Sequence, residues 1–373
     1  MTTLHRGRLR SRRASHRAVA AAIASLTAVG LLTGCTSTSN TASNAEPSPT
    51  ETGYHGAPLT GAAEPGDAPA PKTDPVGTVV DLPAGTHPWG VAVVDRAHTV
   101  YLAARKQDRF AAVDMRDHRV TTKRVPGSAR MIDLASPSGP LLLPAEDKGR
   151  LYELSPTTLD VESSAPAGKH PHQAVRVGDT TFVTEEFGHA VRVLRDGEVV
   201  KRFTQPAQPG GITAVGDRVA AVDVDANLLF VFDAKTLQLV AALPAGKGPS
   251  HVVPIGGDRV AVCDVRGNAV LTYDIGGTPK QLGRAAVPGR AFWIEADAST
   301  GTIYTALSNT NKIAELSVRD DGSPQLVTTV PTVRNPVSFD RDPATGDLYV
   351  GGYAASQLQI IPADAFATSG NAG

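Results

Sequence analysis

The chain is poor in the residues and motifs that mark most recognisable enzyme sites. Its 373 residues include only two cysteines, Cys35 and Cys263, so no cysteine pairs are spaced for a haem or a zinc ribbon. A phosphate-binding glycine loop, a Gly-x-Ser-x-Gly elbow and a His-Glu-x-x-His helix are also absent. The sequence therefore offers none of the sites that these motifs announce. Cys263 lies in an apolar run, where we expect a packed core thiol.

Long apolar runs are equally scarce, and the longest candidate is at the N-terminus. Six arginines and no acidic residue precede the apolar stretch 18–32, which is too short and too rich in alanine to favour a permanent spanning helix. We predict a signal peptide over residues 1–34. It ends in Leu32-Thr33-Gly34-Cys35, which resembles the lipobox of bacterial lipoproteins. The resemblance implies that Cys35 is lipidated and anchors the protein to the outer face of the cell membrane.

Two questions about this N-terminus stay open. An ordinary secretory signal with an incidental cysteine is the alternative to the lipoprotein interpretation. The run Ser11-Arg12-Arg13 is similar to a twin-arginine signal, but Ser15 and His16 depart from that pattern, so the export route is undecided.

Residues 35–75 are dominated by Ser, Thr, Pro, Ala and Gly, which predicts a disordered tether between the lipid and the folded part. Loss of residues 1–34 removes six arginines and changes the net charge from −1 to −7. Because an acidic domain is repelled by phosphate backbones, we expect no nucleic-acid partner.

The rest of the chain repeats one pattern of short apolar strands separated by turns rich in Gly, Asn and Asp. Seven repeat openings follow one another at intervals of 42, 41, 38, 40, 41 and 46 residues: Pro88, Arg130, Pro171, Pro209, Pro249, Arg290 and Pro336. A period near forty residues built from short strands is typical of a β-propeller. The sequence therefore predicts an all-β, seven-bladed propeller over residues 76–364, and we expect a monomer.

The last repeat lacks a fourth strand, because only a short tail follows residue 361. The missing strand is supplied by residues 77–85, whose sequence matches the outer strand of an internal repeat at residues 237–246. We therefore predict that the N-terminal strand pairs into the C-terminal blade and closes the ring, which removes free strand edges. Residues 365–373 are expected to form a flexible tail.

Repeats such as residues 260–274 resemble those of YVTN-type, YncE-like β-propellers, here in a lipoprotein of an actinobacterial type, and the resemblance covers residues 76–362. It implies the fold and leaves the function open, because propellers host many roles. In that family the second strand typically ends in Asn. The equivalent positions here differ: Ala104, Ala145, Glu185, Asp223, Asp264, Leu307 and Gly352.

Polar side chains gather at the loops that enter the innermost strands, which open beside the central channel of a propeller. We predict ligand-binding roles there for His87, Trp89, His170, His172, His251 and Trp293. Imidazole and carboxylate groups suit zinc or another divalent ion. The candidate metal ligands are His170, His172, Glu185, Asp223, His251 and Asp264. The alternative is that the acids cap hairpin turns and that the histidines and tryptophans only pack.

One blade prompts an enzymatic alternative. His170-Pro171-His172-Gln173-Ala174 and the following strand ending at Glu185 are similar to a blade of the streptogramin B lyases. That resemblance implies metal-assisted proton abstraction by His172 and Glu185. In that family a preceding blade supplies a further His and Glu, whereas the loops here at Trp89, Met131 and Gly210 supply neither.

These observations predict a membrane-anchored, extracytoplasmic propeller that binds a protein partner, a small ligand or a metal ion at one mouth of its channel without catalysis. A metal-dependent lyase or hydrolase centred on His172 and Glu185 is one alternative. A metal-handling chaperone that uses the same residues is the other. No cofactor is assigned beyond a divalent metal such as zinc.

Overall fold

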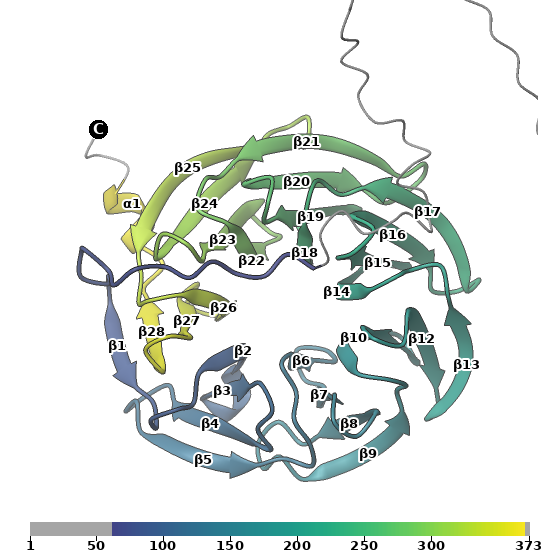
Figure 1. Cartoon of the computed structure of the whole chain (residues 1–373), viewed down its shortest axis with the longest axis horizontal. Helices are drawn as coiled ribbons and strands as arrows, with labels where there is room; N and C mark the ends of the chain where they lie inside the picture. Colours follow the sequence, from purple (N-terminus) through teal and green to yellow (C-terminus); the bar gives the residue numbers. More distant parts are fainter. Residues whose placement is uncertain (1–61, 370–373) are drawn as a thin grey trace, which may run out of the picture. The chain divides into compact units, whose positions relative to one another are not determined.

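The computed structural model describes residues 62–369, and the expected signal peptide, Cys35 and most of the expected tether lie outside them. The described residues form seven four-stranded antiparallel sheets, which follow one another around a central axis (Figure 1). In a propeller this axis is the position of the channel. The predicted fold, an all-β propeller of seven blades, is confirmed. Within residues 62–369 no helix is long and apolar enough to cross a bilayer.

Each blade runs from an innermost strand at the channel to an outermost strand at the rim. Blade 1 contains β2 (Pro88–Val94), β3 (Thr99–Ala104), β4 (Arg109–Asp114) and β5 (Val120–Arg124). Blade 2 contains β6 (Asp133–Leu134), β7 (Leu141–Ala145), β8 (Arg150–Leu154) and β9 (Val161–Pro166). Blade 3 contains β10 (Pro171–Val177), β11 (Thr180–Glu185), β12 (Ala190–Arg195) and β13 (Glu198–Phe203). A single turn of 3₁₀ helix, Asp95–Ala97, joins β2 to β3.

Blades 4 to 7 repeat this order. Blade 4 contains β14 (Pro209–Val215), β15 (Arg218–Asp223), β16 (Leu228–Asp233) and β17 (Gln238–Pro244), and blade 5 contains β18 (Pro249–Pro254), β19 (Arg259–Asp264), β20 (Ala269–Asp274) and β21 (Lys280–Ala286). Blade 6 contains β22 (Ala291–Asp297), β23 (Thr302–Leu307), β24 (Lys312–Val318) and β25 (Pro324–Pro331). Blade 7 contains β26 (Pro336–Arg341), β27 (Leu348–Gly352) and β28 (Gln357–Ile361), with β1 (Thr78–Asp81) outermost.

The hairpin between the second and third strands is closed by one recurring conformation. In six blades the residue four positions after the end of the second strand has a positive φ. These residues are Gly149, His189, Asn227, Asn268, Asn311 and Ser356. Glycine and asparagine tolerate the left-handed region well, so the turn residues seen in the sequence fix where each hairpin reverses.

The first strand of the chain completes the last blade, as predicted. β1 pairs antiparallel with β28, with Thr78 opposite Ile360 and Asp81 opposite Gln357. Gly77, just before β1, has a φ of +74°, and a Cβ there would lie 2.1 Å from the carbonyl oxygen of Ile360. Only glycine allows the chain to turn this close to β28.

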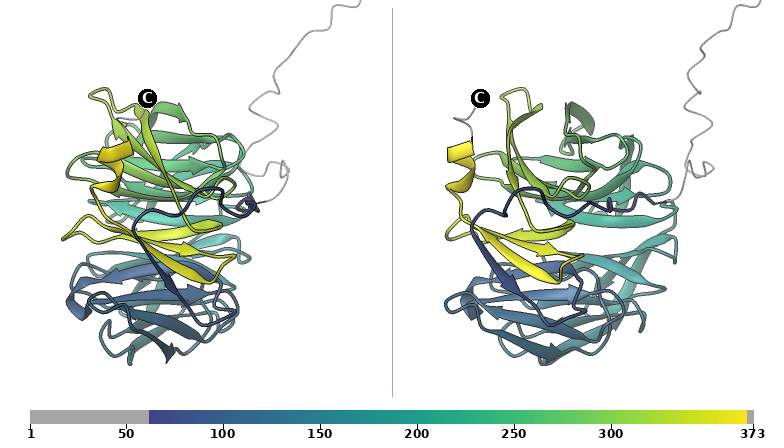
Figure 2. Two further views of the ribbon diagram at one scale, coloured as in Figure 1. Left: turned by 90° about the vertical axis from the view of Figure 1, so that its left-hand side faces the viewer. Right: turned by 60° about the vertical axis from the view of Figure 1, so that its left-hand side comes forward.

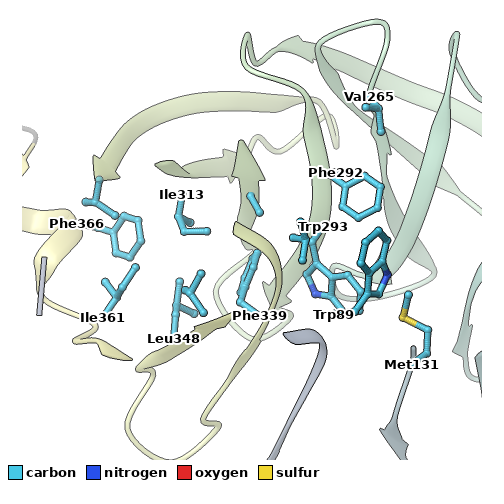
Figure 3. Close-up of a cluster of buried hydrophobic side chains, with 14 of the residues drawn as sticks. Trp89, Met131, Val265, Phe292, Trp293, Ile313, Phe339, Leu348, Ile361 and Phe366 are labelled. Atoms are coloured by element: carbon cyan, nitrogen blue, oxygen red, sulfur yellow. The ribbon is translucent and has the colours of Figure 1, made fainter. Parts of the chain in front are cut away.

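The hydrophobic core consists of clusters between neighbouring blades. One cluster joins blades 6 and 7 through Phe339, Leu348 and Ile313, and it continues to the channel mouth (Figure 3). There Trp89, Met131, Phe292 and Trp293 gather, all 6% exposed or less. The rigid ring therefore brings aromatic side chains of blades 1 and 6 to one place.

Two segments expected to be flexible are packed on the ring. Residues 62–75, the end of the predicted tether, cross one face of the ring toward β1 (Figure 2). Ala68 is fully buried there. At the other end, Ala365–Ser369 forms α1, and Phe366 of this helix is 4% exposed in the cluster between blades 6 and 7. Composition does not predict the packing of either segment. Their few apolar side chains are small or isolated, and parts of the chain that are distant in sequence bury them.

Candidate functional site at the channel mouth

A bulge in the innermost strands directs side chains toward the mouth of the channel. In six of the seven blades, the pairing between the first and second strands shifts register directly after the first residue of the innermost strand. A bulge re-aims the side chains beside it. In each of these blades the next residue lines a pocket at the mouth: Trp89, His172, Gly210, Ser250, Phe292 and Val337.

The acids at the ends of the second strands have local roles. Glu185 receives hydrogen bonds from Arg192 at 2.9 Å and Arg202 at 3.2 Å and from the backbone of Lys169 at 3.2 Å. Asp223 and Asp264 accept backbone N–H groups of the adjacent turns, at 2.9 Å from Ala226 and 2.9 Å from Gly267. These carboxylates therefore cap loops.

Side chains alternate along an extended chain, so the residue directly after the end of a second strand points to the mouth instead. In blades 2 and 3 this residue is Glu146 and Glu186. Their backbone N–H groups donate to the carbonyls of Ser128 at 2.8 Å and His170 at 3.1 Å, which fixes both residues against the loop that enters their own blade.

Arg130 joins the two carboxylates. Its Nε donates to Glu146 and its Nη2 to Glu186, while Gln208 donates to the other oxygen of Glu186 at 3.2 Å. Arg130 is 6% exposed, Glu186 is 7% exposed and the side chain of Glu146 is 9% exposed, so the three charges are held out of bulk water. Buried charges need such pairing, because an unpaired one is very costly.

Two histidines complete this group. Nδ1 of His172 lies 3.8 Å from Glu146 and 3.9 Å from Glu186, and the ring nitrogens of His170 lie 3.7 Å and 3.6 Å from the same two carboxylates. Neither Nδ1 has a hydrogen-bond partner. We call Arg130, Glu146, His170, His172 and Glu186 the mouth cluster.

The electrostatics of the mouth cluster keep both carboxylates ionised. Burial raises the pKa of Glu146, but the neighbouring His172 and Arg130 outweigh it and lower the pKa to about 2. The pKa of Glu186 is also lowered, because the charges of His172 and Arg130 outweigh burial. Burial lowers the pKa of His170 and favours its neutral ring.

His251 faces the mouth from blade 5. Its Nδ1 is 2.8 Å from the carbonyl oxygen of Phe292, and its Nε2 is buried without a partner. Burial lowers its pKa to about 3, so the ring is neutral. With His172 and Glu186 it lines a cavity of about 40 Å³, which Ala62 and Ala63 also line.

The other predicted ligand-binding residues have structural roles in this conformation. His87 is exposed, has a φ of +44°, and contacts the carbonyl of Tyr353 at 2.8 Å. Trp89 meets Phe292 edge-on at 6.0 Å between ring centroids, and the Arg105 guanidinium lies 4.7 Å from the Trp89 ring centroid. Trp293 donates to Glu295 at 3.1 Å.

Only one group of side chains in residues 62–369 has three metal-ligand atoms within 4.8 Å of one another, namely Glu146, His172 and Glu186. Of the predicted metal ligands, the structure places His172 in this group and His170 beside it. It does not bring Glu185, Asp223, Asp264 or His251 into this group, although His251 lines the cavity beside it. The predicted pairing of His172 with Glu185 is not formed. Arg192 and Arg202 form ion pairs with Glu185 and hold its carboxylate on the other side of its strand.

Sequence reasoning missed Arg130, Glu146 and Glu186. The sequence does contain a signal for the two acids. Glu146 and Glu186 each follow directly after the last residue of a second strand, which is Ala145 or Glu185. Arg130 was recognised as a repeat opening, but its charge was not connected with the acids because their meeting depends on the ring.

Comparison with known proteins identifies the architecture and no family. No protein-family model and no curated protein matches the chain. Among solved structures, that of U3-55K has a TM-score of 0.67 at 11% identity, over 76% of this chain and 98% of that chain. Virginiamycin B lyase from Staphylococcus aureus has a TM-score of 0.63 at 14% identity, over 76% and 98% of the two chains. Hydrazine synthase of Kuenenia stuttgartiensis has a TM-score of 0.62 at 17% identity, over 78% and 99%. At such identities the likeness shows the propeller fold alone.

Proposed function

We propose that this protein is an extracytoplasmic binding protein that holds a divalent cation at the channel mouth, without catalysis, and that a lipid on Cys35 anchors it to the outer face of the cell membrane. The observation that carries the proposal is the unpartnered Nδ1 of His172, 3.8 and 3.9 Å from two carboxylates. A buried polar atom normally has a partner, so one without a partner marks a place where a ligand fits.

Size supports an ion over a larger ligand. The cavity beside His172 and Glu186 measures about 40 Å³. This is room for an ion or a water molecule, whereas a drug-sized ligand needs roughly 300 Å³ or more. One imidazole and two carboxylates suit zinc, with water in the fourth position.

Arg130 has a defined part in this proposal. Its guanidinium offsets one of the two negative charges of Glu146 and Glu186 in the absence of a cation, so a metal ion has to displace it. Binding therefore replaces the single positive charge of Arg130 with the two positive charges of a divalent ion beside the same carboxylates. The ion pairs with Arg130 lower the affinity for the metal, because they stabilise the metal-free state.

Calorimetric titration with zinc chloride tests the site. The full chain, purified in mild detergent and freed of metal with a chelator, is expected to bind about one zinc ion. His172→Ala is expected to abolish the heat of binding. Arg130→Met is expected to tighten binding by about ten-fold, because it removes the competing cation.

Glu185→Gln is the matched control, since this carboxylate lies in the same blade but outside the mouth cluster. Its zinc affinity is expected to match that of the wild type, with circular dichroism showing that each variant is folded. Zinc binding that persists in His172→Ala, or its absence from the wild type, contradicts the proposal.

The membrane anchor is tested separately. The lipobox resemblance of Leu32-Thr33-Gly34-Cys35 predicts that mass spectrometry of the mature N-terminus finds Cys35 acylated. Cys35→Ser is expected to release the protein from the membrane fraction. Recovery of an unmodified Cys35, or membrane retention of Cys35→Ser, refutes lipid anchoring.

A further inference from the structure

The segment that crosses the channel-mouth face is bound to the ring along most of its length. Residues 62–69, which we call the strap, pass over blades 6 and 7 in an extended conformation before the chain continues to β1 (Figure 1). The strap belongs to no sheet. Because ring closure begins only at Thr78, the strap can leave the ring without removing a strand from any blade.

Ring side chains hold the strap by its main chain. Ser308 accepts the N–H of Gly66 at 2.8 Å, and Asn335 donates to the Gly66 carbonyl at 2.7 Å. Three further ring side chains donate to strap carbonyls. Arg334 donates to Ala68 at 2.8 Å, Asn311 to Pro69 at 2.9 Å, and Arg290 to Glu64 at 3.3 Å. We call these five ring residues the strap groove. Contacts of this kind recognise an extended backbone and not particular side chains.

The strap groove also limits side-chain size. Ala63 is 8% exposed and Ala68 is fully buried. A Cβ on Gly66 would lie 2.6 Å from the Cβ of Asn309 and 2.8 Å from its Cα. Glu64 and Asp67, in contrast, are exposed. The groove therefore accepts small residues where the chain faces the ring and tolerates polar ones where it faces solvent.

The groove is prepared for an occupant by contacts within the ring. The backbone N–H of Asn335 donates to Asn311 at 2.9 Å, and the Asn335 side chain donates to the carbonyl of Ser308 at 3.1 Å. These bonds do not involve the strap, so the amide groups stay oriented when it leaves. A site with its polar groups already positioned loses less entropy on binding.

We propose that the strap groove is a binding site for extended peptide segments rich in alanine, glycine and proline, and that the strap is its resident occupant. A partner segment of this composition binds after the strap detaches. Covalent linkage gives the strap a high effective concentration, so it is a competitor that the partner has to displace. The proposal goes beyond the cation site. The strap groove shares no residue with the mouth cluster, although Ala62 and Ala63 of the strap line the cavity beside it.

Fluorescence anisotropy with a labelled peptide of residues 62–70 tests this proposal on the full chain. Gly66→Ala in the protein is expected to detach the strap, and the peptide with its native glycine should then bind at least ten-fold more tightly than to the wild type. Ala68→Leu is expected to act in the same way. Ala70→Val, at an exposed position just beyond the strap, is the matched control and should behave as the wild type.

Adding Asn335→Ala to Gly66→Ala is expected to abolish peptide binding, and a peptide carrying Gly66→Ala should not bind. Cleavage of the bond before the exposed Asp67 by an aspartate-specific protease reports detachment and should be faster in Gly66→Ala. Unchanged cleavage, no peptide binding to the detached variant, or equal binding to the Asn335 variant each overturns the proposal. Zinc titration of Gly66→Ala/Asn335→Ala separates the two proposals, because this variant keeps every residue of the mouth cluster and loses only the strap residues Ala62 to Glu64 from the cavity lining.

Discussion

Three acidic residues of the innermost strands carry protons at higher pH than ordinary carboxyl groups. Burial raises the pKa of Asp133 on β6 to about 7, with a contribution from the charge of Asp340. Burial also raises the pKa of Asp340 on β26 to about 6 and that of Glu295 on β22. Gln173 donates to one oxygen of Asp133 at 3.1 Å, and the other oxygen is buried without a partner. The folded ring therefore favours neutral Asp133.

The raised pKa of Asp133 makes the free energy of unfolding depend on pH. The unfolded chain releases this proton near pH 4 and the folded chain near pH 7, so the contribution of Asp133 to stability falls as the pH rises between these values. Asp133→Asn is neutral at every pH. We expect it to match the wild type at pH 4 and to exceed it by about 1–3 kcal/mol at pH 7.5.

Urea unfolding of both proteins at several pH values measures this difference. Asp117→Asn, at an exposed hairpin, is the control and should follow the wild type throughout. A constant difference between Asp133→Asn and the wild type from pH 4 to pH 7.5 would show that Asp133 does not titrate as inferred.

At the scale of single strands, the sequence located elements better than it oriented side chains. The repeat spacing predicts the last residue of the second strand in each blade, from Ala104 in blade 1 to Gly352 in blade 7. All seven predicted residues are the last residues of their strands. The site residues were nevertheless assigned one position too early in blade 3, at Glu185 in place of Glu186. Repeat spacing fixes where a strand ends, but the direction of a side chain depends on bulges and on partners in other blades.

The strand that closes the ring depends on one glycine, which gives a prediction about β1. Gly77→Ala places a Cβ against the carbonyl of Ile360 and also forces alanine into the left-handed region. Gly85 has a similar φ of +79° but no atom within 4 Å of the added Cβ. Gly85→Ala should lose about 1–2 kcal/mol of stability from strain alone, and Gly77→Ala about 3 kcal/mol or more.

Urea unfolding and amide hydrogen exchange in β1 measure both effects. Exchange of the β1 amides should accelerate in Gly77→Ala and stay unchanged in Gly85→Ala. If the two variants lose the same stability, the approach to Ile360 is not what makes glycine necessary at position 77.

At the scale of the whole molecule, the ring is what assembles the functional face. The mouth cluster joins the entrance loops and hairpins of blades 2 and 3. The strap groove lies about 240 residues after the strap in the chain, since 242 positions separate Gly66 from Ser308. Composition alone indicated a tether over residues 62–75, because small residues and proline have no local reason to pack. Their burial depends on Ser308, Asn311 and Asn335, which no local pattern connects to them.

The pairing of β1 with β28 also orders events during synthesis. β1 is the first strand of the ring to emerge from the ribosome, and its partner at Gln357–Ile361 is the last. Until translation has almost finished, blade 7 lacks strands and the ring is open, so the nascent chain has no complete native structure to adopt. On an export route that threads an unfolded chain, the ring would close only on the far side of the membrane, whereas a twin-arginine route would carry the ring after β1 and β28 have paired.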